Sequence, residues 1–287
     1  MFVRTSWGFT LEVPLMLYDY KVIELIGDDR YSAIFKVQNI NTQKYYRAKV
    51  YSKKQMQNSL IVKMIHNEIH IHRMMDHPNI CKLYEYFNIK NEHQEKMTVL
   101  IEKYYPRGNL KDYVKIHGFA NENEKRKIEY GIIQAVDYLH QKQIVHLNIR
   151  PENIYLDDDM NPKLSCFSAS RNIRHKYDFY DYSYHSGIYY REDKKEFNYL
   201  SPEYYECYSY FKDYYYKSDL WSIGILLFFM TERRLPFKCF QEIKKKNQII
   251  EGSDKEVMRI IRQCINVDRT KRPDIHQLIN DPYFAFI

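Results

Sequence analysis

The chain has 287 residues, of which 45% are hydrophobic and 28% charged, a composition typical of a globular protein with a large core. The longest apolar run covers only residues 223–230, too short to cross a bilayer, and we expect no signal peptide from the opening residues. Five scattered cysteines without a CxxC pair favour a reducing compartment, and the formal charge of +7 modestly favours acidic partners.

The region between residues 18 and 102 shows mainly the alternation of apolar and polar residues that is typical of β-strands. Strands are predicted at residues 20–26, 33–40, 41–53 (entered through a turn), 81–89 and 97–104. One helix is predicted over about residues 59–75, ending before the His77–Pro78 break. This region should therefore form a strand-rich lobe, preceded by an N-terminal extension over residues 1–17.

Helical spacing dominates the rest of the chain. Residues 124–141 place apolar side chains on one helical face, and residues 218–231 are apolar nearly all round, which predicts a central buried helix. We therefore expect an α+β arrangement of a strand-rich lobe (18–102), a hinge (103–108) and a helical lobe (109–287). A cleft is expected where the two lobes join.

The segment IVHLNIRPENIYL has the spacing of a catalytic loop but lacks its carboxylate. His146 is followed by Asn148, Arg150 and Asn153, at +2, +4 and +7. NEIHIHRMMDHPNICKLYEYF precedes this loop and VDRTKRPDIHQLINDPYF follows it. With these motifs in this order, the chain resembles the eukaryotic protein kinase domain over residues 18–285. The residues within the motifs most resemble those of the calcium/calmodulin-dependent kinase group. The resemblance implies a two-lobed kinase fold.

The resemblance also implies which residues would hold a nucleotide. Phosphoryl transfer needs bound phosphates, Mg²⁺ to neutralise their charge, and an acceptor hydroxyl that is positioned and deprotonated. Lys49 and Glu68 match the strand lysine and the helix glutamate that pair to hold the phosphates. The other positions of the expected nucleotide site are Gly27, Ile34, Glu102 and Asn153. Ion pairs and loop hydrogen bonds also serve structure, so these residues, and Arg150 in place of the loop lysine, do not decide whether the protein is active.

Two positions have lost the chemistry that the family would supply there. Asn148 replaces the aspartate that acts as catalytic base, and a neutral amide cannot accept the hydroxyl proton. Loss of a general base lowers the rate by roughly 10²–10⁴-fold. Cys166-Phe167-Ser168 replaces the metal-binding Asp-Phe-Gly, and a thiol is a poor ligand for Mg²⁺, which prefers oxygen. We therefore expect no metal at Cys166 and no phosphotransfer.

The expected nucleotide pocket also departs from the family pattern. Gly27 is the one glycine that remains of the glycine-rich loop, and Asp29 and Ser32 take the next two glycine positions. Asp28 and Asp29 also place two negative charges where the triphosphate would lie. Arg47 replaces a small alanine beside the adenine ring, and Tyr155 replaces a supporting leucine. An arginine head could swing outward, but its stem would still crowd the pocket. We expect no cofactor, and ATP with Mg²⁺ only under the alternative interpretation given below.

Positions that maintain the kinase shape, in contrast, keep the expected residues. Glu203 should pair with Arg272, and Asp219 should accept hydrogen bonds from the catalytic-loop backbone. The hydrophobic spine is matched by Leu83, His146 and Phe167, with His72 in the fourth place. Leu147 replaces the arginine that would bind a phosphate of the activation segment, which removes that route of regulation.

Our interpretation is a pseudokinase, a catalytically inactive protein-kinase homologue that acts as a scaffold or docking module. The alternative is a weak or atypical ATP-dependent Ser/Thr kinase, or another transferase, that uses Asn153 and the lysine–glutamate pair. The changes at Asn148 and Cys166 argue against this alternative. Nucleic-acid binding has no supporting motif, and His66 and His70, one helical turn apart, lack a third zinc ligand. We expect a cytoplasmic protein, with the cytoskeleton or an axoneme as one candidate location.

Protein partners are expected at a tyrosine-rich face, residues 177–216. Fourteen of the 29 tyrosines lie in this stretch, which in an active kinase faces the protein substrate. Tyrosine suits interfaces because it buries a large rigid ring and keeps a hydroxyl for hydrogen bonding. Biased composition and scattered phosphorylation sites are the alternatives, but the clustering weakens the first and Leu147 weakens the second. We expect acidic protein partners and no membrane or nucleic-acid partner.

Overall fold

The computed structural model describes residues 2–5, 10–29, 31–51, 59–90, 94, 96–174, 195–206, 212–243 and 250–285. The chain divides into two compact units, unit 1 (Met1–Asp76 and Cys81–Tyr105) and unit 2 (His77–Ile80 and Pro106–Ile287). Each unit is described by itself. Unit 1 consists of an antiparallel sheet with a helix and unit 2 is mainly helical, which confirms the expected α+β fold class.

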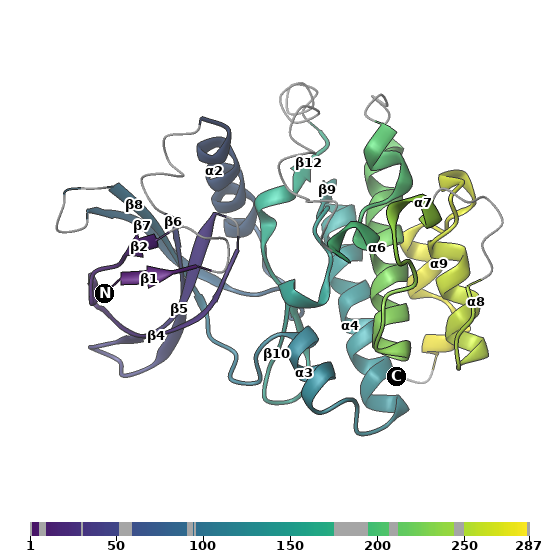
Figure 1. Ribbon diagram of the computed structural model, residues 1–287, viewed down its shortest axis with the longest axis horizontal. Coiled ribbons are helices and arrows are strands. Elements are labelled where there is room, and N and C mark those ends of the chain that lie inside the picture. Colours follow the sequence, from purple (N-terminus) through teal and green to yellow (C-terminus); the bar gives the residue numbers. More distant parts are fainter. Residues whose placement is uncertain are drawn as a thin grey trace. The chain divides into compact units, whose positions relative to one another are not determined.

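Unit 1 is built on a six-stranded antiparallel sheet with the strand order β3-β4-β5-β6-β8-β7 (Figure 1). The strands are β3 (Met16–Leu17), β4 (Tyr20–Asp28), β5 (Ser32–Asn39), β6 (Tyr45–Tyr51), β7 (Leu83–Lys90) and β8 (Lys96–Lys103). A separate hairpin pairs β1 (Phe2–Arg4) with β2 (Thr10–Glu12). Each of the five strands expected from the alternating pattern is present, because alternate side chains of the sheet face a core.

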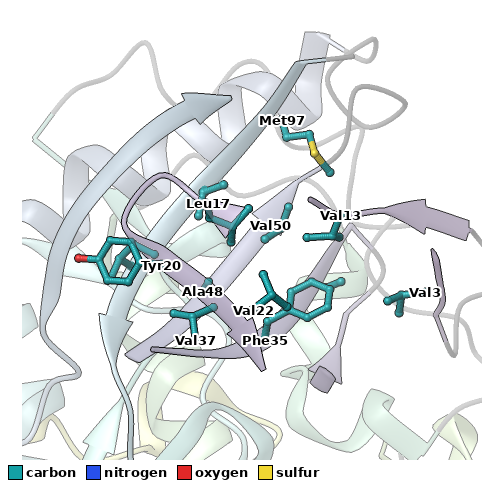
Figure 2. Close-up of a cluster of buried hydrophobic side chains, with 13 residues drawn as sticks. Val3, Val13, Leu17, Tyr20, Val22, Phe35, Val37, Ala48, Val50 and Met97 are labelled. Carbon is teal, nitrogen blue, oxygen red and sulfur yellow. The ribbon is translucent and has the colours of Figure 1, made fainter. Parts of the chain in front are cut away.

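One face of this sheet carries the main hydrophobic core of unit 1 (Figure 2). Phe35 of β5 and Val50 of β6 lie at its centre and are fully buried. The residues that we expected to form an N-terminal extension contribute Val3, Val13 and Leu17 to the same core. The N-terminal segment is therefore packed as part of unit 1.

The other face of the sheet carries helix α2 (Ser59–Arg73). Ile65 and Ile69 of α2 pack with Tyr51 of β6 and Leu100 of β8. Because side chains alternate along a strand, residues that share parity with Tyr51 on β6 lie on this α2-covered face. The charged side chains discussed below lie on this face.

Unit 2 contains six α-helices within the residues that the structure describes. They are α3 (Leu110–Ile116), α4 (Glu122–Gln141), α6 (Lys212–Glu232), α7 (Phe240–Ile243), α8 (Lys255–Cys264) and α9 (Ile275–Ile279). Short antiparallel pairs join β9 (Ile144–Val145) to β12 (Arg171–Asn172) and β10 (Ile154–Leu156) to β11 (Pro162–Leu164). The 3-10 helices are η1 (Pro151–Asn153), η2 (Phe167–Ala169), η4 (Lys195–Tyr199), η5 (Pro202–Glu206), η6 (Arg269–Lys271) and η7 (Pro282–Phe284).

Helix α6 is the buried helix that the sequence predicts. Trp221 is fully buried and its indole N–H donates to the carbonyl of Asn198 at 2.8 Å. A Cβ atom at Gly224 would lie 2.7 Å from the Cβ of Cys264, so glycine is what allows α6 and α8 to approach this closely. Among the described residues, no helix is both long and apolar enough to span a bilayer, α6 included.

Candidate functional site

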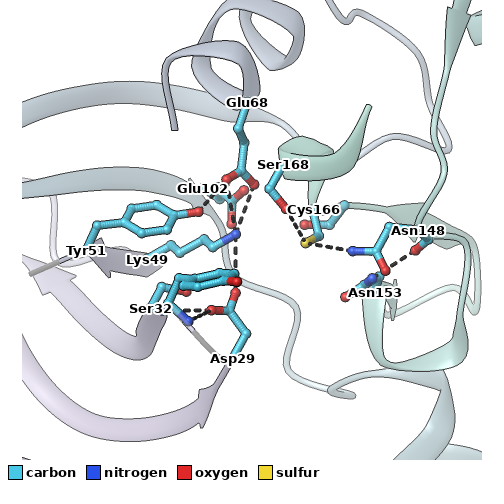
Figure 3. Close-up of polar contacts among 12 residues, drawn as sticks. Asp29, Ser32, Lys49, Tyr51, Glu68, Glu102, Asn148, Asn153, Cys166 and Ser168 are labelled. Atoms are coloured by element: carbon cyan, nitrogen blue, oxygen red, sulfur yellow. Dashed lines mark hydrogen bonds and ion pairs between the residues drawn. The ribbon is translucent and has the colours of Figure 1, made fainter. Parts of the chain in front are cut away.

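In unit 1 the lysine and glutamate positions of the expected nucleotide site are paired (Figure 3). Lys49 Nζ of β6 donates to Glu68 Oε1 and Oε2 of α2 at 3.0 and 3.1 Å. Both side chains are buried, and the hydroxyl of Tyr51 also donates to the Glu68 carboxylate. This ion pair therefore ties α2 to the sheet.

The glycine-loop positions lie at the end of β4, in the turn that follows, and at the start of β5. Gly27 pairs with Ile34 across the two strands, and Asp29 closes the turn. Asp29 Oδ1 accepts hydrogen bonds from the backbone N–H groups of Tyr31 and Ser32, at 2.8 and 2.7 Å. Asp29 Oδ2 lies 3.5 Å from Lys49 Nζ. The loop aspartate is thus turned toward the lysine.

Arg47 points into the α2-covered face of unit 1 and is only 3% exposed. Its Nε donates to Glu102 Oε2 at 2.6 Å, and its Nη2 also contacts this oxygen. Burial alone would raise the pKa of Glu102, but the charges of Arg47, His72 and Lys49 outweigh burial and hold this pKa below its ordinary value. The arginine head, which the sequence left free to swing outward, is therefore held inward by an ion pair.

His72 of α2 adds a second contact to this pair. Its Nδ1 lies 3.5 Å from Glu102 Oε1, and its Nε2 lies 2.6 Å from the carbonyl oxygen of Cys81. The side chain is buried. His72, which the family resemblance assigned to a hydrophobic spine, therefore lies in a polar environment.

In unit 2, the two positions that phosphotransfer would need as carboxylates bond to each other. Asn148 Nδ2 donates to Cys166 Sγ at 3.3 Å, and Cys166 Sγ lies 3.6 Å from the Ser168 hydroxyl (Figure 3). Cys166 has a φ of 70°, the left-handed conformation that side chains with a Cβ rarely adopt. A carboxamide and a thiol thus lie at the two positions where the resemblance implies carboxylates, and a hydroxyl lies beside the thiol.

The remaining catalytic-loop residues make local contacts. Asn153 Nδ2 donates to the carbonyl of Asn148 at 2.9 Å, and Arg150 Nε lies 3.9 Å from Glu152 Oε2. Tyr155 is half-buried on β10. Asn153 therefore makes a hydrogen bond within the loop, and its matching to a metal-binding position stays a prediction.

Asp219 of α6 accepts hydrogen bonds from the backbone of this loop. Its Oδ2 accepts from the backbone N–H of His146 at 2.9 Å, and its Oδ1 accepts from that of Leu147 at 2.8 Å. His140 Nε2 lies 2.9 Å from Oδ2. The ring of His146 contacts Phe167 edge-on with centroids 5.1 Å apart. The loop backbone is therefore held by α6.

Glu203 and Arg272 form a buried, doubly bonded ion pair. Arg272 Nη1 donates to Glu203 Oε1 at 2.5 Å and Nη2 donates to Oε2 at 2.7 Å. Arg272 also donates to the carbonyls of Asn266 and Lys217, at 2.8 and 2.9 Å. This arginine therefore joins three separate segments of unit 2.

The structure brings the sequence-predicted site residues together in two groups, one in each unit. Unit 1 holds Gly27, Ile34, Arg47, Lys49, Glu68, Leu83 and Glu102. Unit 2 holds His146, Asn148, Arg150, Asn153, Cys166, Phe167, Glu203, Asp219 and Arg272. No group of three metal-ligating side chains gathers within the described residues, and His66 and His70 are exposed on α2.

Much of the tyrosine-rich face lies outside the described residues. Residues 175–194 and 207–211 fall in this category, so the partner surface stays a prediction there. Of the tyrosines that are described, Tyr199 and Tyr214 are buried within unit 2. These two rings serve the fold of unit 2.

Sequence reasoning missed Tyr51 and His140. Tyr51 follows Lys49 by two residues, so the alternation that placed Arg47 on the lysine's face could also have placed Tyr51 there. No sequence signal marked His140, because its contact with Asp219 joins residues 79 positions apart.

Comparison with known proteins agrees with the motif order. Residues 20–284 match the family model described as the protein kinase domain. The chain is similar to 3-phosphoinositide-dependent protein kinase B of Dictyostelium discoideum, with 29% identity over 276 residues that cover 94% of this chain and 29% of that protein. It is also similar to serine/threonine-protein kinase SIK1 of Rattus norvegicus, with 25% identity over 286 residues that cover 96% of this chain and 34% of that protein.

A fungal relative is also similar to nearly the whole of this chain. The carbon catabolite-derepressing protein kinase of Candida glabrata is 28% identical over 273 residues, which cover 93% of this chain and 41% of that protein. The chain therefore spans less than half the length of these curated relatives. Because the family model covers nearly the whole chain, this protein belongs to the protein kinase domain family.

Proposed function

We propose that this protein is a pseudokinase, a kinase domain that has lost phosphotransfer and serves as a scaffold or docking module. The observation that carries the proposal is the contact between Asn148 and Cys166, at 3.3 Å. In an active kinase, an aspartate of the catalytic loop accepts the proton of the substrate hydroxyl and another aspartate holds Mg²⁺. Here an amide and a thiol occupy these positions and bond to each other.

The geometry at Asn148 does not fit proton transfer. Its amide nitrogen donates to Cys166 Sγ, and its backbone carbonyl accepts from Asn153. A carboxamide does not take up a proton at neutral pH, so a substrate hydroxyl would find no base here. Phosphotransfer would lose roughly 10²–10⁴-fold in rate from this position alone.

The residues present also do not fit Mg·ATP. Mg²⁺ prefers hard oxygen ligands in near-octahedral geometry, whereas Cys166 offers a sulfur that already accepts from Asn148 and lies 3.6 Å from the Ser168 hydroxyl. In unit 1, Arg47 fills the face on which the family keeps a small residue, and Asp29 contacts Lys49. We therefore assign no step of a reaction to a nucleotide or a metal.

A scaffold role is supported by the contacts that remain. Asp219 holds the catalytic-loop backbone, and Arg272 joins Glu203 to two backbone carbonyls. These contacts preserve the shape of the domain without contributing to chemistry. The partner would be a protein, acidic in view of the net charge of +7, and bound at the tyrosine-rich face of residues 177–216. A cytoplasmic site of action is part of the same proposal.

A phosphotransfer assay with restored carboxylates tests the proposal. The wild-type protein should incorporate no labelled phosphate into itself or a generic substrate. The triple variant Asn148→Asp, Cys166→Asp and Arg47→Ala is the matched comparison, because it returns the base, the metal ligand and the small residue in one chain. Incorporation by the wild type that Lys49→Met abolishes would contradict the proposal.

The second candidate, a weak Ser/Thr kinase, is favoured by one observation. The Lys49–Glu68 pair is intact, and Asn153 is present. The same assay separates the two candidates, since a weak kinase gives incorporation that depends on Mg·ATP and on Lys49. Because Asp29 contacts Lys49, we favour the inactive pseudokinase over the weak kinase.

A further inference from the structure

Lys49 is held between two carboxylates of unit 1. Its Nζ lies 3.0 Å from Glu68 Oε1 on one side and 3.5 Å from Asp29 Oδ2 on the other (Figure 3). The lysine is 1% exposed and Glu68 is fully buried, so water screens their contact little, whereas the Asp29 side chain is 30% exposed and its contact is screened more. Two carboxylates facing one ammonium leave this group with a formal charge of −1. An approaching phosphate would therefore be repelled.

Asp29 also uses the backbone donors of its own loop. Its Oδ1 accepts from the N–H groups of Tyr31 and Ser32, at 2.8 and 2.7 Å. In the kinase family, the glycine-rich loop covers the phosphates and the strand lysine holds them, and backbone N–H groups of such loops form anion-binding concavities. A single carboxylate of this chain contacts both kinds of donor.

We propose that Asp29 is an internal anion that takes the place of a nucleotide phosphate on unit 1. The inference rests on the proposed loss of ATP use and gives that loss a specific residue. Asp29 satisfies the side of the ammonium that a phosphate would otherwise face, and Tyr51 completes the hydrogen bonds of Glu68.

The loop has one further hydrogen-bond donor, the hydroxyl of Ser32. The Ser32 side chain lies on the same sheet face as Lys49 and Tyr51, because Ser32 pairs with Tyr51 and Ile34 pairs with Lys49. Ser32 is fully buried, and its hydroxyl has no hydrogen-bond partner among the described residues. Removing the charge of Asp29 should therefore uncover an oligophosphate site that consists of the lysine and this hydroxyl.

The test uses sodium tripolyphosphate without Mg²⁺, since this probe lacks the base and the metal that other residues would affect. Its affinity is measured by calorimetry and by thermal shift at constant ionic strength. Asp29→Asn keeps an oxygen for the N–H groups of Tyr31 and Ser32 but removes the charge beside Lys49. We expect this variant to bind tripolyphosphate at least about tenfold more tightly than the wild type, because one charge-assisted contact of Lys49 becomes free. Adding Lys49→Met should abolish the gain.

Asp28→Asn removes the same charge from the neighbouring residue of β4 and is the matched control for general repulsion. It should gain less affinity than Asp29→Asn, whose charge contacts Lys49, and an equal gain would overturn the inference. Asp29→Ser, whose hydroxyl can accept from the same N–H groups, replaces Asp29→Asn should that variant not fold. Equal affinities of the wild type and both Asp29 variants, whether high or undetectable, would overturn the inference. Tight binding by the wild type would do so even if phosphotransfer were absent. Phosphotransfer by the wild type would instead overturn the proposed function.

Discussion

Two buried arginine–glutamate pairs, one in each unit, differ in what they do for the molecule. Arg272 and Glu203 occupy positions where the kinase family is expected to keep an ion pair, and the arginine also donates to two backbone carbonyls. Arg47 and Glu102 pair equally closely on β6 and β8, but Arg47 stands where the family has a small residue. The first pair holds segments together, and the second fills space beside the lysine.

Buried charge in this chain therefore has two separate uses. In unit 2 it joins separate segments of the chain, whereas in unit 1 it fills the α2-covered face of the sheet beside Lys49. A buried ion pair is weak support for stability by itself, because desolvation of both charges offsets much of their attraction. The two pairs should therefore respond differently when both partners are replaced.

The largest expected effect is the loss of one partner from the pair in unit 2. Arg272→Ala or Glu203→Ala leaves a buried charge without its counterion, which should lower the free energy of unfolding by about 3–5 kcal/mol. Urea denaturation of each variant measures the loss. Arg259→Ala is the matched control, because Arg259 pairs with Asp281 in two hydrogen bonds but is 47% exposed, so its loss should be about 1 kcal/mol or less. Wild-type stability in both unit 2 variants would show that this pair does not hold the fold.

Replacing both partners by apolar residues should separate the two pairs. Arg47→Met with Glu102→Leu should leave stability within about 1 kcal/mol of the wild type or raise it, since an apolar pair avoids desolvation. Arg272→Met with Glu203→Leu should instead lower stability by about 2 kcal/mol or more, because the carbonyls of Asn266 and Lys217 lose their donor. Equal losses of stability in the two double variants, measured by denaturation, would show that the two ion pairs do not differ in their use.

Another buried carboxylate, that of Glu129 of α4, forms no ion pair with an arginine among the described residues and extends the comparison to pH. It is fully buried and accepts from the Tyr283 hydroxyl at 3.0 Å. Burial raises the pKa of Glu129 from its ordinary value of 4.5 to about 8, although Lys125 and Tyr283 act to lower it. The folded state therefore holds this proton more tightly than the unfolded state does.

The sign of the pH effect follows from that raised pKa. The stabilisation is complete below pH 4.5 and is lost as pH rises through about 8. Within this window the contribution of Glu129 should fall by about 1.4 kcal/mol per pH unit at most. Glu129→Gln removes the titrating group and should flatten the stability profile between those limits. A profile of unchanged slope in this variant would mean that Glu129 is ionised in the folded protein.

The smallest expected effect is that of Mg·ATP, which should not change the melting temperature of the wild type. A ligand present at 100 times its Kd would stabilise the folded state by about 2.7 kcal/mol, so binding at that level would be plain in a thermal scan. Arg47→Ala combined with Asp29→Asn is the variant in which a response could appear. A clear ATP-dependent rise in the wild type would show that Arg47 and Asp29 do not close the site.

The fold was largely predictable because its signals are local. Alternation marked the strands, since one face of the sheet of unit 1 packs in a core around Phe35 and Val50. The largely apolar stretch around Trp221 marked α6, in which residues 218–228 are buried. Motif order then gave the family, because each motif could be assigned to an element in sequence.

The site was predictable in its residues but not in its contacts. Alternation placed Arg47 on the face of Lys49, but its partner Glu102 lies 55 residues away, and their contact depends on the register between β6 and β8. The charge of Asp29 was clear from sequence, whereas its contacts with Lys49 and with two backbone N–H groups depend on the conformation of a turn. Such contacts arise from tertiary geometry that no spacing rule contains.

Incorporation of labelled phosphate by purified wild-type protein, in the presence of Mg·ATP and a mixture of protein substrates, tests the central claim most directly. The control is Lys49→Met, which separates activity of this chain from that of a contaminating kinase. We predict the same background incorporation for both proteins, because Asn148 supplies no base and Cys166 supplies no hard metal ligand. Incorporation above background in the wild type that is lost in Lys49→Met would contradict the account and establish a kinase.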